Sequence, residues 1–140
     1  MQTIKEYGPP ITLASARQLA EAAEAEAARN GWAMVIAIVD STSHLVLLHR
    51  MEQAQYGSIA VAQLKAKSAL DFKRPTKIFE DAVAQGGLGL RMLGIDVICP
   101  LEGGVPIFAD GRLIGAIGIS GALSHQDGAV AAAALATISG

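Results

Sequence analysis

The stretch Val105–Ser120 reads VPIFADGRLIGAIGIS, and it decides the fold class. Two apolar runs, 105–109 and 112–120, flank the dipeptide Asp110-Gly111. An Asp-Gly pair between two such runs is typical of a two-residue β-hairpin turn. The sequence therefore predicts an antiparallel hairpin. The apolar run Ile114–Ile119 predicts that its second strand is buried at the centre of a sheet.

A second hairpin is predicted nearer the N-terminus. Trp32–Asp40 and His44–Met51 are both largely apolar, and the residues between them, 41–43, are turn formers. Strands that are apolar on both sides predict a sheet with both faces covered. A further short apolar run, Ile95–Cys99, supplies a fifth strand, so we expect a five-stranded, mainly antiparallel sheet.

Helices are predicted before, between and after these strands. Leu13–Asn30 is rich in Ala, Glu and Arg, and Thr12 is placed to cap its N-terminus. The glycines in 86–89 predict a mobile loop. Three further helices are predicted, with Ser58 and Ser124 as caps: Ser58 to about Phe72, Lys77 to about Gln85, and Ser124 to about Ser139. This order lacks the strand–helix alternation of a parallel sheet, so the predicted class is α/β of the α+β type.

Composition limits the kind of protein. A chain of 140 residues with 51% hydrophobic and 17% charged residues can bury a core, and we expect one domain over residues 1–140. The net charge of −2 and the scattered basic residues argue against nucleic-acid binding. Much small apolar surface, mostly Ala, predicts a homo-oligomer.

The expected compartment is the cytoplasm. No run approaches about 18 consecutive apolar residues, so no membrane association is expected. The first ten residues show no secretory leader, and Cys99 is the sole cysteine, which excludes an internal disulfide.

Several motifs resemble the GlcG-like family, also called haem-degrading or HbpS-like. The most specific are LEGGVPI at 101–107 and IGAIGISG at 114–121. Others lie in Val39–Met51, Gly57–Lys67, Arg74–Thr76 and Gln126-Asp127. The resemblance implies a profilin-like three-layer α/β/α architecture. It also implies haem binding or haem handling, and it extends to the C-terminal domain of PduO-type proteins.

The segment Glu102-Gly103-Gly104 is the first candidate site. Two glycines allow close backbone approach, so their N–H groups could bind a carboxylate or a haem propionate, with Glu102 as an acid–base group. The alternative is an ordinary tight turn in which Glu102 is solvated.

The start of the last predicted helix is the second candidate. Ser120 and Gly121 end the central strand and open towards that helix, whose N-terminal N–H groups could receive an anion. His125 and Asp127 are crowded there as ligand-binding candidates. In the alternative interpretation Ser124 caps the helix and Asp127 completes a capping box.

Lys67 and Arg74 form the third candidate. Their separation of seven residues places both on one face if the helix continues that far. The resemblance favours Lys67 as a catalytic or carboxylate-binding lysine, able to pair with Glu102, and Arg74 as a second cation. The alternatives are surface charge or a structural ion pair for Lys67, and capping of helix carbonyls by Arg74.

The histidines are candidate ligands of haem iron. His44 and His49 lie five residues apart on one strand and point to opposite faces, so they cannot share a metal. His49 or His125 could be a haem axial ligand. The sequence contains no HxH, HExxH or Cys/His cluster, so no dedicated metal site is predicted.

Three functions remain open. The first is a haem-binding or haem-handling protein. The second is a small catabolic enzyme, of deaminase, hydratase or isomerase type, acting on a carboxylate-bearing intermediate. The third is a non-catalytic regulatory or scaffold subunit. The expected ligand is accordingly haem or a small anion.

Overall fold

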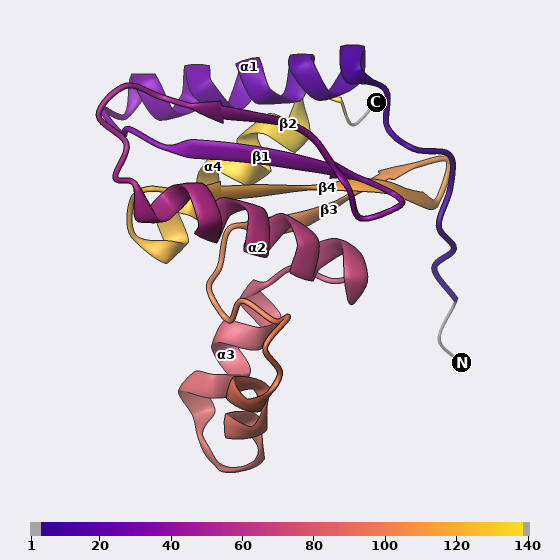
Figure 1. The fold of residues 1–140 in the computed structure, drawn as a ribbon, viewed down its shortest axis with the longest axis vertical. Helices are drawn as coiled ribbons and strands as arrows, with labels where there is room; N and C mark the ends of the chain where they lie inside the picture. Colours follow the sequence, from indigo (N-terminus) through magenta and orange to yellow (C-terminus); the bar gives the residue numbers. More distant parts are fainter. Residues whose placement is uncertain (1–3, 139–140) are drawn as a thin grey trace.

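The computed structural model describes residues 4–138, in which one antiparallel sheet has helices on both faces (Figure 1). The strands are β1 (Val35–Asp40), β2 (Leu45–Arg50), β3 (Gly104–Ala109) and β4 (Arg112–Ser120). They lie in the order β2-β1-β4-β3, and every neighbouring pair is antiparallel. The predicted central position of β4 is therefore confirmed.

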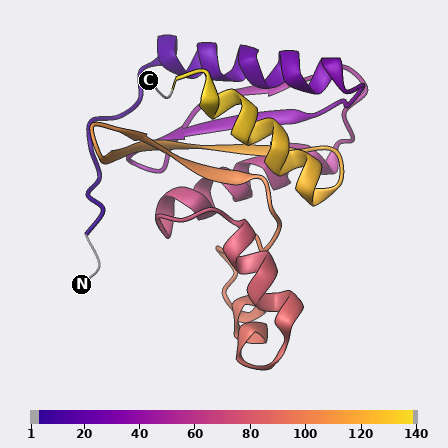
Figure 2. The same ribbon diagram turned by 180° about the vertical axis from the view of Figure 1, so that it is seen from behind.

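The sheet separates the core into two parts, and helices cover each of them (Figures 1 and 2). Helices α1 (Leu13–Arg29) and α4 (Ser124–Ala136) pack on the face that carries Ile36, Ile117 and Ile119. Helix α2 (Gly57–Asp71) packs on the opposite face. The α+β class is confirmed, whereas the profilin-like comparison stays a prediction. The predicted end of the last helix, Ser139, lies outside the described residues.

Two local signals behave as predicted. Asp110 and Gly111 both have positive φ, 54° and 75°, as a two-residue hairpin turn of type I′ requires. Thr12 caps α1, since its Oγ1 accepts a hydrogen bond from the Ser15 N–H at 3.1 Å. Both signals depend only on residues close in sequence.

Close contact between α2 and β4 requires glycine at position 118. A Cβ on Gly118 would lie 2.6 Å from the Ala66 nitrogen and would collide with the Ala62 carbonyl oxygen. The helix backbone thus rests directly on the strand, and a glycine inside a strand marks such an approach. Gly118 is therefore a packing position.

The predicted strand Ile95–Cys99 is wrong, so the described sheet has four strands rather than five. The Ser68 hydroxyl has the Leu64 and Val97 carbonyls as acceptors, at 2.7 and 3.1 Å, and accepts from the Cys99 N–H at 2.9 Å. Pro100 has no N–H to add to a ladder. A helix side chain therefore takes the hydrogen bonds that a neighbouring strand would supply.

A loop was predicted at 86–89, but residues 87–89 begin a 3-10 helix. Helix α3 (Lys77–Gln85) and the 3-10 helix η1 (Gly87–Gly94) form a helical hairpin that projects from the body (Figures 1 and 2). A Cβ on Gly89 would collide with the Ala82 carbonyl, so the two helices meet backbone to backbone. We call residues 77–97 the arm. The bounds of α3 match the prediction.

Among the helices of residues 4–138, none is long and apolar enough to span a bilayer.

Candidate functional site

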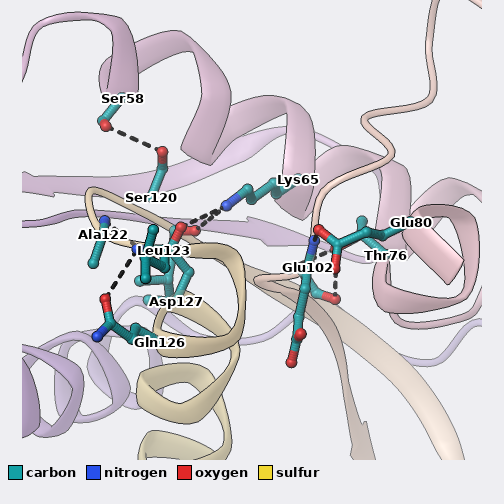
Figure 3. Close-up of polar contacts among 12 residues, drawn as sticks. Ser58, Lys65, Thr76, Glu80, Glu102, Ser120, Ala122, Leu123, Gln126 and Asp127 are labelled. Atoms are coloured by element: carbon teal, nitrogen blue, oxygen red, sulfur yellow. Dashed lines mark hydrogen bonds and ion pairs between the residues drawn. The ribbon is translucent and has the colours of Figure 1, made fainter. Parts of the chain in front are cut away.

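The structure places Lys65, rather than Lys67, against the Glu102–Gly104 turn (Figure 3). Lys65 is 1% exposed, and its Nζ donates to the Ile119 carbonyl and to Asp127 Oδ2, each at 2.9 Å. Asp127 is 2% exposed, and its Oδ1 accepts from the Ala122 N–H at 2.9 Å. One buried ion pair therefore ties α2 to the end of β4 and the first turn of α4.

The charges of this pair depend on each other. Burial raises the pKa of Asp127, while the Lys65 ammonium and the backbone N–H groups of Ala122 and Gly121 act to lower it. Without Lys65, the Asp127 carboxylate would be a buried charge with no cation beside it.

Both candidate glycines pack on Lys65, Gly103 at its ammonium and Gly104 at its backbone. A Cβ on Gly103, where φ is +134°, would lie 2.9 Å from Lys65 Nζ and 2.6 Å from the Ile119 oxygen. A Cβ on Gly104 would lie 2.7 Å from the Lys65 carbonyl carbon, and the Gly104 N–H donates to Thr76 Oγ1 at 2.9 Å. The geometry favours the turn interpretation, because the protein itself occupies the space beside these glycines. Ligand binding by them stays a prediction.

Glu102 lies on the other side of the turn (Figure 3). Its N–H donates to Glu80 Oε1 at 3.1 Å. Its carboxylate rests on α4, since a Cβ on Gly128 would lie 2.6 Å from Glu102 Cδ. The predicted contact between Glu102 and Lys67 does not form.

Lys67 points away from the turn. Its Nζ donates to Ser43 Oγ at 2.7 Å and lies 3.5 Å from Asp71 Oδ2, in an exposed ion pair. Helix α2 ends at Asp71, so Arg74 does not share a helix face with Lys67. Arg74 Nε instead donates to the carbonyl of the C-cap residue Phe72 at 2.8 Å, which confirms the capping alternative.

The spacing of the buried residues in α2 distinguishes Lys65 from Lys67. The buried face of α2 follows the helical period, and Lys65 falls on it between small residues: Ser58, Ala62, Lys65, Ala66 and Ala69. Lys67 falls on the opposite face. A lysine in a stripe of small buried residues predicts a buried partner.

At the start of α4 the predicted Ser124 cap is wrong. Leu123 is the N-cap, and its N–H donates to Gln126 Oε1 at 3.0 Å. Asp127 turns inward to Lys65 instead of completing a capping box with Ser124. The His125 side chain is exposed and makes no hydrogen bond or ion pair with any residue in the described range.

Ser120 and Gly121 are built into the same end of the sheet. The buried Ser120 hydroxyl donates to Ser58 Oγ at 3.1 Å. Gly121, with φ of +155°, abuts the residues just before β1, since a Cβ there would lie 2.8 Å from Met34 Cα. Neither residue faces an open space, so their part in ligand binding stays a prediction.

A cavity of about 490 Å³ follows β2 at this end of the sheet. The segment Arg50–Tyr56 lines it. The Arg50 side chain is exposed and has no ion-pair or hydrogen-bond partner within residues 4–138. The volume falls in the range of small-molecule sites, roughly 300–1,000 Å³.

His49 lies beside this cavity in sequence and faces α1. Its Nδ1 is 2.6 Å from Glu24 Oε1, and both side chains are about one-third exposed, 32% and 39%. Nε2 has no hydrogen-bond partner among the described residues. A histidine whose one nitrogen donates to a carboxylate and whose other nitrogen is free is the usual arrangement of a metal-ligating imidazole. His44, in contrast, bonds Thr42 Oγ1 at 2.9 Å within the β1–β2 turn.

Comparison with known proteins decides the family. The family model described as "Haem degrading protein HbpS-like" matches residues 11–136. The chain belongs to this family. The resemblance inferred from its motifs is thereby confirmed.

Three members or neighbours illustrate the likeness to HbpS-like proteins. Protein GlcG of Escherichia coli K12 is 36% identical over 99 residues, covering 71% of this chain and 72% of GlcG. Klebsiella pneumoniae protein ORFY has a crystal structure that superposes with a TM-score of 0.85, at 33% identity over 97% of this chain and 95% of that one. A crystal structure of a PduOC–haem complex gives 0.83, at 30% identity over 92% and 95%.

Proposed function

We propose that this HbpS-like protein binds haem, with His49 as an axial ligand of the iron. The observation that carries the proposal is the likeness, at 30% identity over 92% of the chain, to a structure solved as a haem complex. The family description, haem degrading, points to the same ligand.

The His49–Glu24 pair supports iron ligation on this chain. Glu24 accepts the Nδ1 proton, which fixes the ring orientation and leaves Nε2 as the ligating nitrogen. The carboxylate also makes the imidazole a stronger donor. His125 is the second candidate ligand, but no carboxylate orients its ring in the described structure. When bound, haem supplies an iron centre whose potential depends on its axial ligand.

The face of β2 that carries His49 is apolar. Leu47 and Met51, two residues on either side along the chain, are partly buried against the core on the α1 face. Arg50, the next residue on β2, points to the opposite face of the sheet and offers an unpaired guanidinium to the cavity, where a carboxylate would pair with it. Tyr56, which is 82% exposed, lines the same cavity. The proposal therefore assigns no propionate cation beside His49.

Titration with haemin, followed by Soret absorption, tests this proposal. We expect saturable binding by the wild type and at least tenfold weaker binding by His49→Ala. Glu24→Gln should weaken binding by about 10–100-fold, the usual effect of losing a carboxylate behind a ligating histidine. His44→Ala is the matched control and should bind as the wild type does. Equal titration curves for His49→Ala and wild type would contradict the assignment.

A small catabolic enzyme acting on a carboxylate is the alternative, favoured by the 490 Å³ cavity with its unpaired arginine. Lys67 and Glu102, which lie outside this cavity and do not contact each other, stay predicted carboxylate-binding and acid–base groups of such an enzyme. A regulatory or scaffold role is expected if neither haemin nor an anion binds. A cytoplasmic location stays a prediction.

The variant Lys67→Ala tests whether Lys67 binds an anionic ligand or only makes an exposed ion pair. Because its ion pair with Asp71 is exposed, the free energy of unfolding should fall by no more than about 1 kcal/mol. If Lys67 binds the ligand, affinity for an anionic ligand should fall by roughly 1.5–3 kcal/mol, the worth of a charged hydrogen bond. Lys77→Ala, which breaks the exposed Lys77–Asp81 pair, is the control. Equal anion binding by both variants and wild type would exclude Lys67 from the site.

A further inference from the structure

The cavity after β2 has a polar lining that the haem proposal does not use. The segment Arg50–Tyr56 lines this space of about 490 Å³ where the chain passes from β2 to α2 at one end of the sheet (Figure 1). Most of the lining residues carry polar side chains: Arg50, Glu52, Gln53, Gln55 and Tyr56. In small-molecule sites, a few placed polar groups set the orientation and the specificity of the ligand. This lining therefore suits a small polar ligand.

Two opposite charges on the lining have no partner in the protein. Arg50 and Glu52 are exposed, and neither side chain makes a hydrogen bond or an ion pair with any residue in 4–138. They do not pair with each other, although only Met51 separates them in the sequence. A guanidinium binds a carboxylate through two parallel hydrogen bonds, and a carboxylate binds an ammonium. A ligand that satisfies both side chains must carry one group of each sign.

The fold holds the loop that presents these charges in one shape. The Met51 N–H donates to the Met34 carbonyl at 3.0 Å, and the Ala54 N–H donates to the Met51 carbonyl at 3.2 Å. Ala54 is buried in the core on the α2 face. Between these anchors Gln53 has φ of +70°, which is uncommon for a residue with a side chain. A cavity formed in advance loses little conformational freedom on binding.

We infer that this cavity binds a small zwitterion of the α-amino acid class, with Arg50 on its carboxylate and Glu52 on its ammonium. One carbon separates the two groups in an α-amino acid, so a molecule lying between the two side chains contacts both. The backbone N–H groups of Glu52 and Gln53 have no acceptor in the described part of the chain and are further donors for the carboxylate. A ligand with a carboxylate alone would be repelled by Glu52.

The other polar groups on the lining are neutral. The Gln53 amide and the Tyr56 hydroxyl have no hydrogen-bond partner among the described residues. Gln55 Nε2 donates to Ser58 Oγ at 3.2 Å, which leaves the Gln55 carbonyl oxygen available. Neutral donors and acceptors match a neutral polar side chain on the ligand. L-Glutamine carries such a side chain and is therefore the probe.

This site goes beyond the haem proposal and does not depend on it. His49 and Arg50 are consecutive on β2, so their side chains point to opposite faces of the sheet. His49→Ala should therefore bind L-glutamine as the wild type does, and Arg50→Gln should bind haemin as the wild type does. Each site can fail its own test without affecting the other.

Isothermal titration calorimetry with L-glutamine tests the inference. We expect saturable binding by the wild type and at least tenfold weaker binding by Arg50→Gln, because a charged pair of hydrogen bonds is lost. Arg91→Gln is the matched control, since Arg91 is also exposed without a partner within residues 4–138 but lies on the arm. It should bind as the wild type does. Circular dichroism confirms that each variant is folded.

Two analogues test the requirement for both charges. N-acetyl-L-glutamine lacks the ammonium, and the α-amide of L-glutamine lacks the carboxylate, so each should bind the wild type at least tenfold more weakly than L-glutamine. In Glu52→Gln, L-glutamine should lose its advantage over N-acetyl-L-glutamine. A wild type that does not bind L-glutamine would overturn the inference. So would equal binding of all three probes, or a Glu52→Gln variant that keeps the preference for the free ammonium.

Discussion

Lys65→Met is expected to lower the free energy of unfolding by about 3–5 kcal/mol, the usual cost of removing one partner of a buried ion pair. Lys65 and Asp127 are each no more than 2% exposed and lie 2.9 Å apart. The variant would leave the Asp127 carboxylate without its cation in a place that water does not reach. Urea unfolding at neutral pH measures the loss.

Two comparisons make this test specific. Lys67→Met, two residues along the same helix, removes only an exposed pair and should cost no more than about 1 kcal/mol. Adding Asp127→Leu to Lys65→Met removes both charges and should recover much of the stability. Equal losses for Lys65→Met and Lys67→Met would show that the buried pair does not hold these elements together.

The loss should also depend on pH. Burial raises the pKa of Asp127, and removing Lys65 strengthens that effect because the opposing ammonium is gone. A carboxyl whose pKa is higher in the folded than in the unfolded state favours folding below its unfolded pKa. That contribution is lost as the pH rises through the folded pKa. The difference in stability between Lys65→Met and wild type should therefore shrink as the pH falls towards the ordinary range of a carboxyl.

Gly118→Ala is expected to destabilise the protein by about 1–3 kcal/mol or more, as overpacking of a core does. The new methyl would lie 2.6 Å from the Ala66 nitrogen and against the Ala62 carbonyl. These are backbone atoms of α2, so relief requires the helix to move off the sheet. Thermal unfolding followed by circular dichroism measures the effect.

Gly57→Ala is the matched control. Nothing lies within 4 Å of a Cβ at this position in the first turn of α2. Alanine should be neutral there or should stabilise by roughly 0.4–1 kcal/mol, because it reduces the freedom of the unfolded chain. If Gly118→Ala proved as stable as Gly57→Ala, the direct contact between α2 and β4 would be wrong.

Local signals predicted most of the fold. The Asp110-Gly111 turn, the Thr12 cap and the bounds of α3 and β4 each depend on residues near one another in the chain. The run Ile95–Cys99 misled the prediction because apolar residues alone do not show where backbone hydrogen bonds go. Its partner is the Ser68 hydroxyl, about thirty residues earlier.

The candidate site was less predictable because its contacts join distant residues. The motifs favoured Lys67, whereas the helical period of α2 places Lys65 at the turn. His49 was a candidate, but its carboxylate partner Glu24 lies 25 residues away on α1. Contacts between residues so far apart in the sequence can be predicted only once the packing of the helices on the sheet is known.

Chemical rescue of His49→Gly tests the haem proposal most directly. Haemin is titrated into the wild type, into His49→Gly, and into His49→Gly with added imidazole, and the Soret band is followed. If His49 ligates the iron, the variant should lose the wild-type band and bind haemin at least tenfold more weakly. Free imidazole should restore the band, because it supplies the missing ligand. A wild-type titration curve for His49→Gly without imidazole would contradict the account.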